Sequence, residues 1–247
     1  MLQSILVYGF MIVTLYQTFQ IRVLSINNRI TANVTPLYNW SIWIGVIVFT
    51  FFSAVRWDVG IDHLSYLEDY SSICKYGSLD REDMEIGYVY LQLFLAELGA
   101  HFTIYFGLVA FMQLFFCVNS FRKELYILPY LLVLIMCGGD YFFWMNGMRQ
   151  ALVCTAFLFV VSLTIERRRV LLYICMILLL SFIHTSAVFL LPFCLLYFFN
   201  LEKFFIPRWL QLSLFFAALF LSQMSIWEYL LKYVDIISAA IGYDRFD

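Results

Sequence analysis

Residues 102–121 read FTIYFGLVAFMQLFFCVNSF, a run that contains no charged side chain. Its apolar residues occupy every face of a helix rather than one stripe, which is typical of a segment that contacts lipid or other helices on all sides. A helix needs about 20 mostly apolar residues to cross a hydrocarbon core roughly 30 Å thick. This stretch therefore predicts a transmembrane helix.

The rest of the chain has the same character. Of the 247 residues, 64% are hydrophobic and 13% are charged, whereas a soluble domain has roughly 45–50% apolar and about 25% charged residues. This composition excludes an ordinary soluble enzyme. The sequence has no basic tract, so nucleic acid is not expected as a partner. No two of the six cysteines have CxxC spacing, and no set of acidic residues has the tight spacing of metal ligands, so we expect no metal.

Polar clusters divide the chain into nine apolar blocks, at about 2–19, 37–55, 86–98, 102–121, 125–139, 149–165, 170–183, 186–200 and 208–224. The block 86–98 is too short to cross, because a helix of that length reaches only about 20 Å. We therefore expect an all-α, polytopic integral membrane protein. It would have about eight transmembrane helices plus one short re-entrant or interfacial helix, with residues 1–247 forming a single transmembrane domain.

The charges indicate which loops face the cytoplasm. If 86–98 does not cross, one set of loops holds nine of the fifteen basic residues and only three of the 17 acidic ones. Those basic residues are Arg22, Arg29, Arg122, Lys123, Arg167, Arg168, Arg169, Lys203 and Arg208. Basic loops mark the cytoplasmic side. The loops 56–85 and 138–150, together with His184, are therefore predicted to face outward.

The outward loop 56–85 begins with a dense polar segment. Arg56 and Asp58 lie at the membrane boundary, where an arginine that snorkels beside a counter-ion is one interpretation. The alternative is a ligand site, because Asp58, Asp62 and Tyr66 recur every fourth residue and would share one helical face. Glu85 opens the short block, so it could either cap that helix or bind a ligand.

The loop 138–150 ends with Arg149 and Gln150 in the first turn of a predicted span. A cation at a helix N-terminus costs up to about 1 kcal/mol unless an anion compensates it. Asp140 is one candidate for that anion, and a ligand phosphate is the other, since a helix N-terminus with a guanidinium suits a diphosphate. Trp144 and Asn146 precede Arg149 in the same loop.

His184 stands between two apolar blocks that contain few other polar residues. It could be a structural histidine in a tight helical hairpin. It could also be a general base, because histidine titrates near neutral pH. Its predicted position on the same side as Arg56 and Arg149 favours a common site.

Four motifs in this order resemble one family. They are Arg56-xxx-Gly60-x-Asp62-xxx-Tyr66, Glu85-x-Gly87-Tyr88, Asn146-xx-Arg149-Gln150 and His184-x-Ser186-Ala187. Together they cover about residues 50–200 and are similar to the EpsG-type membrane proteins, which belong with the Wzy polysaccharide polymerases. Members of that family usually continue with further spans, so we expect this chain to be a fragment or a short member.

The resemblance implies a glycosyl transfer at the outer face of the bacterial inner membrane. The donor would be a glycan on undecaprenyl diphosphate, and the acceptor would be the non-reducing sugar of another lipid-linked repeat unit. The donor's diphosphate bond supplies the energy, so no nucleotide, metal or other cofactor is expected. The implied partners are undecaprenyl-diphosphate-linked oligosaccharides, membrane lipid, a chain-length regulator and a flippase.

The resemblance also implies roles for the polar residues. Arg149 and Arg56 would neutralise the leaving diphosphate. Either Asp62 or His184 would accept the proton of the acceptor hydroxyl. The substrate-binding candidates are Asp58, Tyr66, Glu85, Trp144, Asn146 and Gln150.

Three other functions fit a membrane protein of this kind. A flippase would be expected to carry ionisable residues through the depth of the membrane and internal repeats, whereas here the charges gather at one face. An O-antigen ligase would perform a similar transfer to a different acceptor. A non-catalytic scaffold would tolerate the loss of Arg149 and His184.

Overall fold

The computed structural model describes residues 2–27, 39–77, 84–165, 168–197 and 207–223, and the regular structure in these ranges is entirely helical. The helices are α1 (Leu2–Asn27), α2 (Trp40–Ala54), α3 (His63–Tyr76), α4 (Ile86–Glu97), α5 (Phe102–Ser120), η1 (Leu125–Ile127), α6 (Leu128–Cys137), α7 (Asp140–Asn146), α8 (Met148–Thr164), α9 (Val170–Ser181), η2 (Thr185–Tyr197) and α10 (Arg208–Gln223). Every predicted apolar block therefore corresponds to a helical segment.

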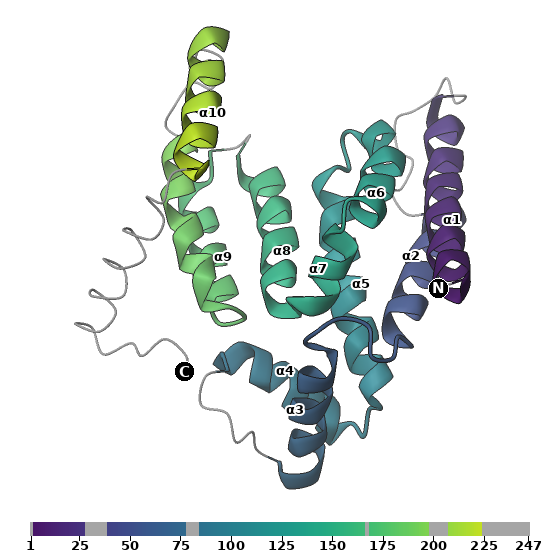
Figure 1. Cartoon of the computed structure of the whole chain (residues 1–247). Helices are drawn as coiled ribbons and strands as arrows, with labels where there is room; N and C mark the ends of the chain where they lie inside the picture. Colours follow the sequence, from purple (N-terminus) through teal and green to yellow (C-terminus); the bar gives the residue numbers. More distant parts are fainter. Residues whose placement is uncertain (1, 28–38, 78–83, 166–167, 198–206, 224–247) are drawn as a thin grey trace, which may run out of the picture. The chain divides into compact units, whose positions relative to one another are not determined.

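The chain forms two compact units, Met1–Phe198 and Phe199–Asp247. In the first unit α5 is central and packs against α2 and α8, while α1 packs against α2 and α6, and α9 packs against η2. Figure 1 shows the short helices α3 and α4 together at one end of this unit, near the end of α2 and the beginning of α8. In the second unit the described helix is α10.

Small residues allow the longer helices to approach closely. A Cβ atom at Gly45 of α2 would lie only 2.6 Å from Thr18 Oγ1 and 2.9 Å from a ring carbon of Phe19, both on α1. A glycine at such a crossing lets two backbones pack tightly, as is common between membrane helices. The helices α1 and α2 are therefore closely packed at this crossing.

Within the described ranges, the helices Ser4–Ser25 and Phe102–Ser120 are individually long and apolar enough to cross a membrane. Leu125–Cys137 and Asp140–Asn146 form a pair bent by 68°, and they qualify as a third span only if they are counted together. The remaining apolar helices have 10–17 residues. The helical, membrane-type architecture is confirmed, whereas the count of eight spans and the re-entrant or interfacial position of α4 remain predictions.

Each of the two loops that the sequence predicts to face outward contains a helix. The segment 56–85 includes α3, and 138–150 includes α7, which follows a sharp break at Gly139 with φ +92°. The expectation that Asp58 shares a helical face with Asp62 and Tyr66 is wrong. Asp58 has a left-handed backbone (φ +50°) and precedes α3, which begins only at His63.

Candidate functional site

Three segments that are distant in sequence meet at the carboxylate of Glu85. Its Oε2 accepts a hydrogen bond from the Arg149 guanidinium, at the start of α8. Its Oε1 lies 2.6 Å from Nδ1 of His184 and accepts hydrogen bonds from the backbone N–H of Thr185 at 3.0 Å and from its hydroxyl at 3.1 Å. We call Glu85, Arg149 and His184 the carboxylate cluster.

The local backbone holds Glu85 in this position. Glu85 is the N-cap residue of α4, but its side chain makes no capping hydrogen bond and turns instead toward Arg149 and His184. Two residues later, the N–H of Gly87 donates to the carbonyl of Phe182 at 2.9 Å, at the end of α9. A Cβ at Gly87 would lie 2.7 Å from that oxygen, so only glycine allows α4 to begin this close to α9.

The surroundings of Glu85 stabilise its ionised form. Burial by itself would raise the pKa of this carboxyl group. The backbone N–H of Thr185, the positive charge of Arg149 and the hydrogen bond with His184 outweigh burial and lower the pKa from 4.5 to about 2. Glu85 is therefore a permanent anion at neutral pH, and it can hold a cation and a histidine simultaneously.

This depressed pKa predicts how stability depends on pH. The folded state binds the Glu85 proton less tightly than the unfolded state, so the stabilisation is complete above about pH 4.5 and is lost as the pH falls toward 2. We expect Glu85→Gln to remove on the order of 2 kcal/mol of stability at neutral pH. In this variant the unfolding temperature should also fall less steeply as the pH is lowered, a decrease that we call the acid limb. Thermal unfolding in detergent between pH 6 and 2.5 measures this.

The control is Glu97→Gln, which removes an exposed carboxylate from the other end of α4. This variant should keep the acid limb of the wild type. An unchanged acid limb in Glu85→Gln would contradict the assignment of the low pKa to this group.

A polar cavity of about 160 Å³ opens beside the carboxylate cluster. Arg149 lines it together with one face of α3 and a methionine, and the full lining is Asp62, Ser65, Tyr66, Asp69, Met84 and Arg149. Tyr66 is buried and lines the cavity beside Arg149. The ring of Tyr88 lies 6.0 Å from the Arg149 guanidinium carbon. We call this space the Arg149 cavity.

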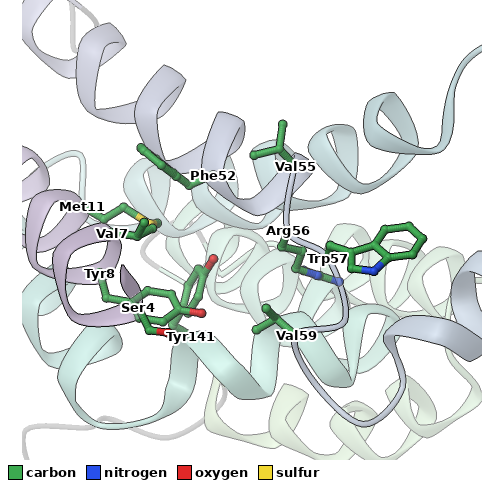
Figure 2. A pocket seen from close by; sticks show the side chains of 10 residues that line it. All are labelled: Ser4, Val7, Tyr8, Met11, Phe52, Val55, Arg56, Trp57, Val59 and Tyr141. Atoms are coloured by element: carbon green, nitrogen blue, oxygen red, sulfur yellow. The ribbon is translucent and has the colours of Figure 1, made fainter. Parts of the chain in front are cut away.

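The structure places Arg56 in a different cavity, of about 440 Å³, which Figure 2 shows. It is lined by Ser4, Val7, Tyr8, Met11, Phe52, Val55, Arg56, Trp57, Val59 and Tyr141, and none of these residues lines the Arg149 cavity. Arg56 is buried, and its Nη2 donates to the carbonyl oxygen of Met145 at 3.0 Å. We call this space the Arg56 cavity.

Several predicted binding residues lie outside both cavities. Trp144 is buried and packs edge-to-face on Phe49, with ring centroids 6.2 Å apart. Asn146 lies against Gly60, where a Cβ would overlap its Oδ1. Gln150 and Asp58 are exposed. The structure therefore brings together five of the predicted site residues, namely Asp62, Tyr66, Glu85, Arg149 and His184. The other binding candidates, Asp58, Trp144, Asn146 and Gln150, do not line the same cavity.

Two features of the site were missed by the sequence reading. Asp69, for which the sequence predicts no role, is buried and lines the Arg149 cavity. Its signal was present, because it lies seven residues after Asp62 and therefore on the same helical face. The anion beside Arg149 is Glu85 rather than Asp140, and nothing in the local sequence indicates that pairing.

In chemical terms, the site combines a histidine oriented by a carboxylate, a guanidinium at the edge of a polar cavity, and two further carboxyl groups. Within the described ranges, no group of three or more His, Cys, Asp or Glu side chains is arranged to hold a metal ion. Such a set of groups can accept a proton, stabilise a developing anion and bind hydroxyl groups.

The EpsG family model matches residues 39–243, which is most of the chain and includes both cavities except the lining residues from α1. No curated protein and no solved structure matches the chain.

Proposed function

Because the chain belongs to the EpsG family, whose members are Wzy-type polysaccharide polymerase-like proteins, we propose that it polymerises oligosaccharide repeat units carried on undecaprenyl diphosphate. The family and the apolar helices make it a membrane protein of polysaccharide biosynthesis. The proposal adds the lipid-linked substrate and a reaction at the outer face of the bacterial inner membrane.

One observation carries the proposal, namely the joining of Arg149 to His184 through Glu85 beside a polar cavity. A histidine whose Nδ1 is bonded to a carboxylate is fixed in one orientation, and its Nε2 is then the basic nitrogen. A guanidinium close to that histidine is suited to the charge that develops on a leaving diphosphate.

The proposed transfer proceeds in one displacement. Nε2 of His184 accepts the proton of the acceptor hydroxyl, and the acceptor oxygen forms a bond to the anomeric carbon of the donor sugar. The bond between that carbon and the diphosphate oxygen breaks, and the electron pair leaves with undecaprenyl diphosphate, which Arg149 stabilises. Asp62, which lines the Arg149 cavity, is the alternative base.

The other groups of the Arg149 cavity suit a sugar. The carboxyl groups of Asp62 and Asp69 can accept hydrogen bonds from hydroxyl groups, and Tyr66 supplies an aromatic face and a hydroxyl. Glu85 contributes by orienting Arg149 and His184, so it acts as a positioning residue.

The test is a gel of surface polysaccharide and lipid-linked intermediates from the native host after deletion of this gene. Complementation with wild type should restore the polymer ladder, whereas His184→Ala should restore less than about 1% of it, because a general base contributes 10²- to 10⁴-fold. The matched control is His101→Ala, since His101 is exposed, caps α5 and does not line the Arg149 cavity.

The intermediates distinguish the candidate functions. Single repeat units that accumulate on the outer leaflet support a polymerase. Repeat units trapped on the inner leaflet would indicate a flippase, and long lipid-linked polymer left untransferred would indicate a ligase. Full activity of both His184→Ala and Arg149→Ala would indicate a scaffold and would overturn the proposal, as would an unchanged ladder after deletion of the gene.

A further inference from the structure

The Arg56 cavity contains a charge that the described part of the protein leaves uncompensated. Arg56 is 7% exposed. Its guanidinium contacts the sulfur of Met145, lies 3.1 Å from the sulfur of Met148 and donates to the carbonyl of Met145. Its carbon atom stands 5.0 Å from the centre of the Phe106 ring. All of these partners are neutral.

Neutral partners satisfy hydrogen bonds but do not cancel a charge. Among the described residues, no carboxylate forms an ion pair with Arg56, and its Nε atom is buried without any hydrogen-bond partner. A buried cation of this kind costs free energy unless an anion accompanies it. This situation contrasts with that of Arg149, which has Glu85 as its counter-ion.

The space beside Arg56 is large enough for a ligand and is mainly apolar. Its volume of about 440 Å³ lies in the range of small-molecule sites, roughly 300–1,000 Å³. Figure 2 shows the hydroxyl-bearing rings of Tyr8 and Tyr141 on one side and Arg56 with Trp57 on the other. Most other lining side chains are aliphatic or aromatic.

The position of the cavity points to a lipid. Arg56 and Trp57 directly follow α2, and Trp57 is 62% exposed, as is typical of tryptophan at a membrane interface. Val7 on α1 and Val55 at the end of α2 line the cavity and are also exposed. An apolar chain could therefore enter from the membrane while its headgroup reaches Arg56.

From this combination we infer that the Arg56 cavity binds an anionic amphiphile, with a phosphate group on Arg56 and an apolar chain along α1 and α2. The two tyrosine hydroxyls can donate hydrogen bonds to the phosphate oxygens. Two sources share this chemistry, an anionic phospholipid and a polyprenyl phosphate. The site is separate from the Arg149 cavity, and the inference does not depend on the proposed polymerase reaction.

The experiment uses the whole protein, purified in a non-ionic detergent, and measures the thermal unfolding temperature during titration with four probes. These are dioleoyl phosphatidylglycerol, farnesyl phosphate, dioleoyl phosphatidylcholine and inorganic phosphate. We expect stabilisation by phosphatidylglycerol, farnesyl phosphate or both, and none by the other two. Whichever anionic probe binds more tightly identifies the source.

Two variants locate the binding. Arg56→Leu removes the charge, and we expect the apparent affinity for the anionic probe to fall by about 10-fold or more, because a charge-assisted contact is lost. Val7→Trp fills the cavity, keeps the charge, and should weaken binding similarly. This second variant also tests the inference if Arg56→Leu does not fold.

The matched control is Arg149→Leu, which removes an arginine from the other cavity and should leave the binding of phosphatidylglycerol unchanged. Equal stabilisation by phosphatidylcholine or by inorganic phosphate would overturn the inference. So would retention of wild-type affinity in both Arg56→Leu and Val7→Trp, or a loss caused by Arg149→Leu alone.

Discussion

Arg149→Ala is expected to lower the rate of polymer formation by about 1,000-fold, the upper end of the effect of removing one group that stabilises a developing anion. In the described part of the chain, Arg149 is the only basic residue that lines the polar cavity. The alanine variant leaves Glu85 with His184 and Thr185 as partners, so the protein should still fold. The measurement is polymer formed per unit of membrane-inserted protein, from lipid-linked repeat units.

Arg149→Lys separates charge from geometry. Lysine keeps the positive charge but lacks the planar fork that can bind Glu85 and a phosphate oxygen simultaneously. We expect a loss of about 10- to 100-fold, between wild type and alanine. If Arg149→Ala loses less than about 5-fold, Arg149 does not stabilise the leaving group.

The carboxylate cluster also predicts non-additive effects. Arg149 and His184 share Glu85 as a partner, so Glu85→Ala disturbs the orientation of both. We expect the double variant Glu85→Ala/His184→Ala to be about as inactive as His184→Ala alone, because groups that act as a unit lose their function together. Multiplicative effects would show that Glu85 and His184 act independently.

Gly87→Ala is the second change with a large expected effect. The added methyl group would lie 2.7 Å from the Phe182 carbonyl oxygen, which is backbone and cannot rotate away. We expect a destabilisation of about 1–3 kcal/mol. We also expect a loss of activity of about 100-fold, because α4 must shift and carries Glu85 away from His184.

Gly9→Ala is the matched control for this substitution. Gly9 lies within α1, and a Cβ there would meet no atom within 4 Å. Alanine is the better helix former, so this variant should be neutral or more stable by up to about 1 kcal/mol. Thermal unfolding and the polymer assay measure both variants, and equal behaviour of the two would contradict the close packing at Gly87.

The helical segments could be predicted from the sequence because they depend on local composition. The block 102–121 became α5 (Phe102–Ser120), and the block 86–98 became the short helix α4. The helix α7 was missed, because its seven residues lie between glycines that were read as part of a loop. The backbone turn at Asp58 was missed as well, since a left-handed aspartate leaves no periodic signal.

The candidate site was less predictable, because its pairings are long-range. Charge patterning predicted that the loops 56–85 and 138–150 and His184 lie on the same side of the membrane. The contacts of Glu85 with Arg149 and with His184 show that these segments are close together. The specific partners depend on tertiary packing, such as the approach of Gly87 to Phe182. Arg56 and Arg149 lie in two different cavities, and this likewise could not be predicted from their positions in the sequence.

The long-range pairing of Glu85 has a consequence for biosynthesis. Glu85 is separated from Arg149 by 64 residues and from His184 by 99. During synthesis, the carboxylate of Glu85 therefore leaves the ribosome before either partner does. Its full set of hydrogen bonds forms only after the turn that follows α9 leaves the ribosome. The order of translation thus delays the contact between Glu85 and His184 until most of the surrounding helices have been synthesised.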